Sequence, residues 1–212
     1  MPRISNDRAT RALGVICLLG VAVFAIVCLA AQFLRSDYNP LGVPLSFYVL
    51  GPYGDMVQAS FFVLAPGLAA VGVGGYLALD RRARSATPLL LFVLAGIALC
   101  VTAAELTDVP GHPPTLHGFI HVRAAAVTFF SVTIAMLLQS WRLRLDTHWR
   151  ARFRSAFTLA AITFVALWIY ALVRSIPRGL AEKVVIALIL AWLWRAGWWL
   201  VRGPASNPRR FG

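Results

Sequence analysis

The sequence predicts an all-α protein, a polytopic membrane bundle of six transmembrane helices with both termini in the cytoplasm. Hydrophobic residues make up 59% of the chain and charged residues 13%, whereas soluble domains have about 45–50% and about 25%. The apolar residues gather in six runs of about 17 to 23 residues, the length that a hydrocarbon core about 30 Å thick requires. Basic residues cluster between these runs, as topology signals do. The net charge of +12 therefore does not indicate nucleic acid as a partner.

The first run covers residues 12–34 and follows a basic leader, residues 1–11. It is longer than the core of a signal peptide, about 7–15 residues, so we expect an uncleaved span. Cleavage near Ala30 and Ala31 is the alternative. Three prolines and three glycines in residues 35–55 prevent a long helix there. The apolar and aromatic residues of this connector indicate a segment that lies at the bilayer interface or caps the bundle.

The second and third runs, residues 57–79 and 88–106, are separated by a short arginine cluster and predict a tight hairpin. Small residues along the second run predict a face that other helices approach closely: Gly67, Ala70, Gly74 and Gly75. The fourth run ends near Leu138, and the fifth and sixth cover residues 157–173 and 184–201. We expect one domain over residues 12–201 and a cytoplasmic tail over residues 202–212. The three cysteines lie in apolar runs and are expected to be packed thiols.

The basic residues are distributed unequally between the two sides that alternating spans define. Fourteen lie on the side of the termini and four on the opposite side. The positive-inside rule then places both termini in the cytoplasm and the loop between the third and fourth runs outside the inner membrane.

That central stretch, residues 101–123, holds three of the four histidines and is the predicted site. His117 and His121 are four residues apart and share one helix face, the spacing of metal-binding helices. With Asp108 they form a ligand set that suits a divalent metal such as zinc, and the same three residues are the candidate catalytic groups. Structural polar packing and ligand binding without a metal are the alternatives. Haem is disfavoured, because the two buried candidate ligands lie on one helix.

Four further residues are candidates for ligand binding: Arg123, Ser46, Tyr53 and Arg178. Arg123 lies inside the fourth run, where an unpaired cation is costly. Either it pairs with Glu105 or Asp108, or its side chain extends to the outer interface, or it clamps an anionic head group. Of these we expect the ion pair. His148 lies in a basic cytoplasmic loop and is expected to be solvated.

Several short motifs resemble an uncharacterised six-helix bacterial membrane family, domain of unknown function 998. They are Tyr38-Asn39-Pro40, Leu45-Ser46, Gly51-Pro52-Tyr53-Gly54, Thr107-Asp108 with His117, and Gly179-Leu180-Ala181-Glu182-Lys183. The resemblance implies a six-span membrane protein and no known activity. In residue type alone, a serine, an aspartate and paired histidines at one membrane face are also similar to the ceramidase-like membrane hydrolases.

The sequence therefore predicts an inner-membrane protein with an outward-facing Asp/His site that hydrolyses or binds a lipid-like substrate, with a metal for hydrolysis. The alternative is a non-enzymatic membrane protein whose outer loops bind lipid or a partner. The expected partners are membrane lipids, a second copy of the chain, or another membrane protein.

Overall fold

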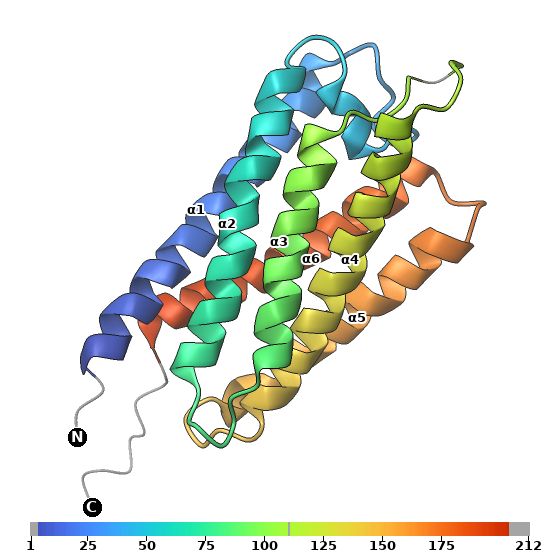
Figure 1. Cartoon of the computed structure of the whole chain (residues 1–212). Coiled ribbons are helices and arrows are strands. Elements are labelled where there is room, and N and C mark those ends of the chain that lie inside the picture. Colours follow the sequence, from blue (N-terminus) through green and yellow to red (C-terminus); the bar gives the residue numbers. More distant parts are fainter. Residues whose placement is uncertain (1–3, 110, 204–212) are drawn as a thin grey trace, which may run out of the picture.

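The computed structural model describes residues 4–109 and 111–203, and this part of the chain forms helices and no strand. Six long helices run up and down in one bundle (Figure 1). They are α1 (Ile4–Leu34), α2 (Gly54–Ala78), α3 (Ala86–Ala104), α4 (Leu116–Leu143), α5 (Phe153–Leu172) and α6 (Arg178–Arg202), with the short 3-10 helices η1 (Leu45–Val49) and η2 (Arg150–Arg152). All six are long and apolar enough to cross a membrane. The predicted fold class is confirmed.

The bundle has two ends with different contents. The start of α1 and the end of α6 lie together at one end, which we call the terminal end (Figure 1). The opposite end, which we call the loop end, holds η1, the α3–α4 loop and the α5–α6 turn. Six helices that cross a bilayer leave these ends on its opposite sides. Which of them faces the cytoplasm stays a prediction from the arginine distribution.

Helix α2 occupies the centre of one layer and packs against α1, α3 and α6. The predicted helix face of small residues is confirmed. A Cβ on Gly74 would lie 2.6 Å from the Leu200 side chain of α6, and one on Gly75 would lie 2.7 Å from Gln139 of α4. Without side chains at these positions the helices approach closely enough for dispersion contacts to hold them, which matters in lipid, where the hydrophobic effect drives no helix association.

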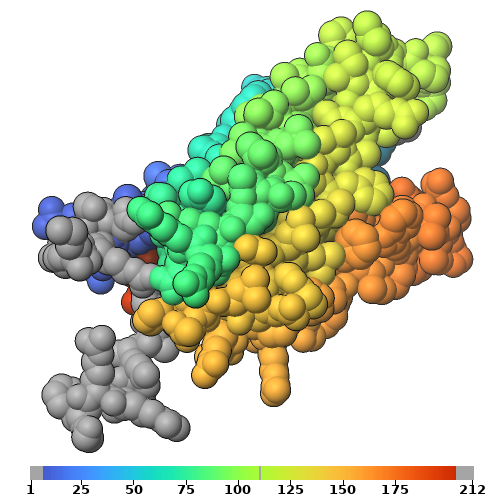
Figure 2. All heavy atoms as spheres, turned by 60° about the horizontal axis from the view of Figure 1, so that its bottom comes forward, coloured from blue at the N-terminus to red at the C-terminus, as the bar shows by residue number. Residues whose placement is uncertain are grey.

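Helix α4 packs against α3 and α5 and scarcely touches α6. Toward the loop end α4 and α5 diverge (Figure 1). Figure 2 shows the surface notched between the start of α4, in yellow-green, and the end of α5, in orange. The bundle is therefore tight where α1, α2 and α6 meet and looser where α4 passes α6.

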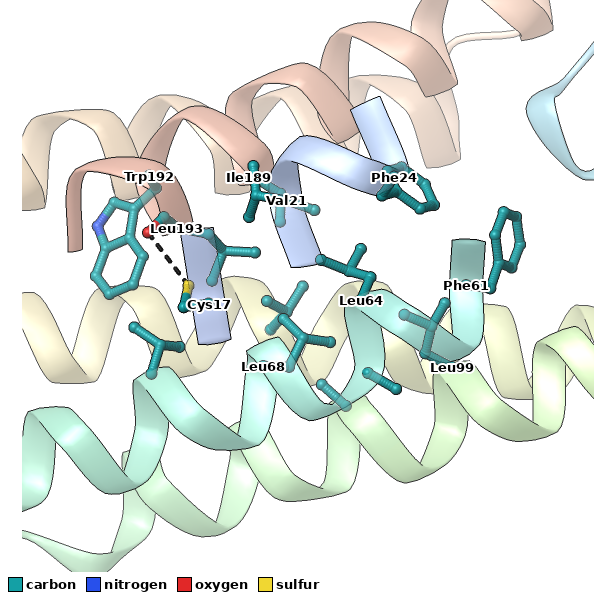
Figure 3. Packing of buried hydrophobic residues seen from close by; sticks show 14 of the residues in the cluster. Cys17, Val21, Phe24, Phe61, Leu64, Leu68, Leu99, Ile189, Trp192 and Leu193 are labelled. Carbon is teal, nitrogen blue, oxygen red and sulfur yellow. Dashed lines mark hydrogen bonds between the residues drawn. The ribbon is translucent and has the colours of Figure 1, made fainter. Parts of the chain in front are cut away.

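Buried side chains from α1, α2, α3 and α6 interlock in the tight part (Figure 3). Cys17 is fully buried there, and its thiol lies 3.5 Å from the carbonyl oxygen of Leu193. Cys28 is also buried and all three cysteines are free, as the sequence predicted.

Candidate functional site

A cavity of about 650 Å³ lies in the loop half of the bundle. All six helices and η1 contribute to its wall. It occupies the space between α4 and α6, which scarcely touch each other. Most of its lining is apolar, and the side chains of α4 that bound it include the small Ala125 and Ala126. Val122 lies at the rim and is 60% exposed, so the cavity reaches the lipid-facing surface beside α4.

Polar side chains gather at the loop end of this cavity. They are Ser46, Thr102, Thr107, His121, Tyr170, Arg178 and Glu182. Glu182 is only 6% exposed, and its Oε2 accepts the N–H of Leu45 at 2.8 Å. Arg178 lies one turn before Glu182 on the same face of α6, donates to the carbonyl of Tyr170 and stacks 4.1 Å from its ring centroid. A cation and a carboxylate thus stand side by side at one end of an apolar space.

His121 contributes the third ionisable group. It is 2% exposed, and because a carbonyl can only accept, its Nδ1–H donates to the Glu105 carbonyl at 2.7 Å. This bond fixes the ring, so Nε2 is the nitrogen left for a ligand. In the neutral ring that nitrogen is a hydrogen-bond acceptor.

The residues 39–45 form a loop that is clasped to the start of α6. The N–H groups of Gly179 and Leu180 donate to the carbonyls of Gly42 and Leu41 at 3.1 and 2.8 Å. The Lys183 ammonium donates to the Val43 carbonyl at 2.8 Å and to that of Pro40. A Cβ at Gly179 would lie 2.4 Å from the Val43 carbonyl oxygen, so only glycine allows this approach. Together with the Leu45–Glu182 bond, this clasp closes the polar end of the cavity.

Arg35 fixes the rest of the connector. Its guanidinium holds the Asp37 carboxylate with two bonds of 2.8 and 2.7 Å, donates to the Leu50 carbonyl and stacks on Tyr38. These bonds hold the pKa of Asp37 below its usual range and raise the pKa of Arg35. The connector that follows α1 is therefore held by Arg35 at its start, through Asp37 and Tyr38, and near its end, through Leu50.

The three predicted metal ligands face different partners. Asp108 accepts the hydroxyl of Thr115 at 2.6 Å and its N–H at 3.1 Å, and Thr115 in turn caps α4 by accepting the Gly118 N–H. His117 is 74% exposed on its side chain and pairs with the Glu105 carboxylate. His121 is bonded to the Glu105 carbonyl. The metal and catalytic roles of Asp108, His117 and His121 stay predictions, and each group already has a protein partner.

The four predicted ligand-binding residues divide into two pairs. Ser46 and Arg178 line the cavity, whereas Tyr53 and Arg123 are not part of its wall. Among the described residues Arg123 forms no ion pair with Glu105 or Asp108, so the expected pair is wrong: Arg123 is exposed, and its guanidinium lies 5.1 Å from the ring of Phe119, one turn earlier. The side chain reaches back along its own helix at the surface, so it needs no acid to balance it.

A different group of possible metal ligands lies at the terminal end. Ligand atoms of Asp80, Asp146 and His148 lie within 4.8 Å of one another. Both oxygens of the fully buried Asp146 accept backbone N–H groups, from Asp80 at 2.7 Å and from His148 at 2.8 Å. This carboxylate joins the α2–α3 and α4–α5 loops. His148, which was expected to be solvated, is half exposed and lies beside two carboxylates.

Residues 18–199 match the family described as protein of unknown function DUF998. The chain belongs to this family. No curated protein and no solved structure shows a significant match to it. The DUF998 match runs from within α1 to near the end of α6 and so includes the whole cavity and its clasp.

Glu182 lines the cavity but was not among the site residues predicted from the sequence. The sixth run was placed at residues 184–201, which left Glu182 outside the membrane helix, whereas α6 begins at Arg178. The signal was present in the sequence, since Arg178, Glu182, Ile186 and Ile189 recur at the spacing of one helix face. An acid on such a face indicates a functional group by default.

Proposed function

We propose that this DUF998 protein binds an amphipathic, lipid-like molecule in the 650 Å³ cavity, with its chain along α4 and α6 and its polar group at Arg178, Glu182 and His121. The single observation that supports this most is the division of one cavity into an apolar body and a polar end. Its volume lies within the range of about 300–1,000 Å³ that small-molecule sites occupy.

The position of the cavity supports the same assignment. The apolar body lies between helices that are long and apolar enough to cross the hydrocarbon core, and the polar groups lie at its loop end, the end at which a spanning bundle would meet lipid head groups. A lipid that enters the cavity beside Val122 can keep the orientation that it has in its leaflet, with its head group toward the loop end. On the positive-inside prediction that leaflet is the outer leaflet of the inner membrane.

The polar groups suit a head group that offers hydrogen-bond donors as well as negative charge. Nε2 of His121 and the second oxygen of Glu182 accept, while the Arg178 guanidinium donates. Metal-dependent hydrolysis has less support than binding, because two of its three expected groups, Asp108 and His117, are not part of the cavity wall and bond to Thr115 and Glu105.

The test uses a phospholipid with a photoreactive diazirine in its acyl chain, mixed with the protein in bilayer nanodiscs. Ala126→Phe puts a ring into the cavity and should lower photolabelling at least about fivefold, since the ring would occupy part of the space proposed for the acyl chain. The matched control is Ala187→Phe, an exposed position on α6 that does not line the cavity. Equal labelling of the two variants, with unchanged thermal stability, would contradict the proposal.

A further inference from the structure

A second cavity, of about 300 Å³, lies at the terminal end, on the opposite side of the membrane from the lipid-like site. The start of α1, the end of α2, the α4–α5 loop and the end of α6 meet around it. Its described lining carries three arginines, Arg11, Arg84 and Arg202, against one acid, Asp7. A cavity walled by three guanidinium groups and one carboxylate has a surplus of positive charge.

One buried donor in the wall of this cavity, and a second that contacts the wall from behind, have no acceptor among the described residues. Trp149 lines the cavity and is 4% exposed, and its Nε1–H has no partner. Arg152 stacks 4.6 Å from the Trp149 ring and donates from Nη2 to the Gly203 carbonyl at 2.9 Å, but its buried Nη1 has none. Buried donors in native proteins are nearly always satisfied, so two unsatisfied ones side by side point to an acceptor that does not belong to the described residues.

Two of the three arginines, Arg84 and Arg202, are held in position by the protein itself. Arg84 donates from Nε to the Leu79 carbonyl at 2.9 Å and from Nη2 to that of Leu77 at 3.1 Å. Arg202 stacks 4.4 Å from the ring of Trp198. Guanidinium groups fixed in this way lose little side-chain entropy on binding, and their forked donors match the oxygens of a phosphate.

We infer that the terminal cavity is a binding site for a phosphate-bearing anion, held by Arg11, Arg84 and Arg202 and by the free N–H of Trp149. Two sources carry this chemistry. One is the head group of an anionic phospholipid in the leaflet at the terminal end, and the other is a soluble phosphate compound from that side of the membrane. The site shares no residue with the proposed lipid-like site, so either can fail without the other.

The experiment measures the indole N–H resonance of Trp149 by nuclear magnetic resonance of the ¹⁵N-labelled protein in detergent. Trp149→Phe assigns the resonance by its loss. One arm titrates inorganic phosphate against sodium chloride of equal ionic strength. The other titrates phosphatidylglycerol against phosphatidylcholine. A saturable shift with phosphate identifies a soluble anion, and one with phosphatidylglycerol alone identifies a head group. No shift in either arm overturns the inference.

Matched double variants separate a built site from general surface charge. Arg11→Gln with Arg202→Gln removes two exposed arginines of the cavity wall and should weaken binding at least about tenfold. Arg81→Gln with Arg154→Gln removes two exposed arginines that do not line the cavity and should weaken it less than about twofold. Equal weakening by both pairs overturns the inference. Arg84 is left unchanged because its bonds hold the end of α2.

Discussion

Replacing Gly179 by alanine tests the clasp between residues 39–45 and α6. The new Cβ would lie 2.4 Å from the Val43 carbonyl oxygen and 2.7 Å from its carbonyl carbon, and backbone cannot swing aside as a side chain can. Separating the two segments breaks the bonds from Gly179 and Leu180, at about 1 kcal/mol each. Overpacking adds about 1–3 kcal/mol, and the higher helix propensity of alanine returns about 1 kcal/mol. We expect Gly179→Ala to lower the free energy of unfolding by about 2–4 kcal/mol.

Reversible unfolding in mixed micelles of a mild detergent and sodium dodecyl sulfate, followed by circular dichroism, measures this free energy. Gly42→Ala is the matched control, since Gly42 lies in the same clasp but its Cβ would meet only the Asn39 carbonyl, at 3.8 Å. Its effect should stay within about 0.5 kcal/mol. Because helix propensity alone would make Gly179→Ala stabilising, an unfolding free energy equal to or above that of the wild type would refute the reasoning.

Three further predictions concern topology, metal and pH. Cysteines introduced at Thr115 and Leu145 should label from opposite sides of intact membranes, with only Thr115 open to an impermeant external reagent; labelling from one side would contradict the six-span orientation. Elemental analysis of the purified protein should show a bound metal, which His121→Ala removes if the sequence-predicted site holds it and His148→Ala removes if the group of Asp80, Asp146 and His148 does; metal-free protein throughout would reject both sites. Because its arginine partner lowers the pKa of Asp37, the pair stabilises the fold above the unfolded pKa of about 3.9 and loses that stability as the pH falls through the folded value. Asp37→Asn should therefore unfold with less dependence on pH below about 4, and an unchanged acid profile would show that the pair contributes nothing.

Hydropathy predicted the fold because a bilayer leaves few alternatives. Every backbone group in the hydrocarbon must bond within its own helix, so six sufficiently long apolar runs become six helices. The ends of the helices were predicted less well. α1 begins at Ile4 and α6 at Arg178, each several residues before its apolar run. Turns that carry arginine remain helical where the charge is accommodated: Arg8 and Arg11 of α1 are exposed, and Arg178 of α6 bonds to the Tyr170 carbonyl.

The central stretch was predicted to be polar, and the structure confirms that its side chains bond to one another. The sequence of residues 101–123 does not show which way each side chain points within the bundle. His117 and His121 share a helix face, yet one is exposed beside the Glu105 carboxylate and the other is buried against the Glu105 carbonyl. Spacing along one helix fixes a direction around that helix. It does not fix the depth at which the neighbouring helices leave space, and the cavity depends on that depth.

Two of the motifs by which the sequence resembles DUF998 meet although they are far apart in sequence. Residues 39–45 and 179–183 form the clasp, and Asp108 caps α4 through Thr115. In the clasp these polar groups bond to the backbone of a neighbouring segment, Lys183 to two carbonyls and Glu182 to the Leu45 N–H, and non-helical chain at the membrane surface needs such partners in order to be stable. The motifs therefore maintain a covered polar end above an apolar cavity. Relatives that keep the clasp but differ along Val122, Ala126 and Ile186 would retain the cover and change the shape of the space beneath it. On the proposed function, selectivity for the bound molecule would depend on the apolar faces of α4 and α6, to which the quoted motifs do not extend.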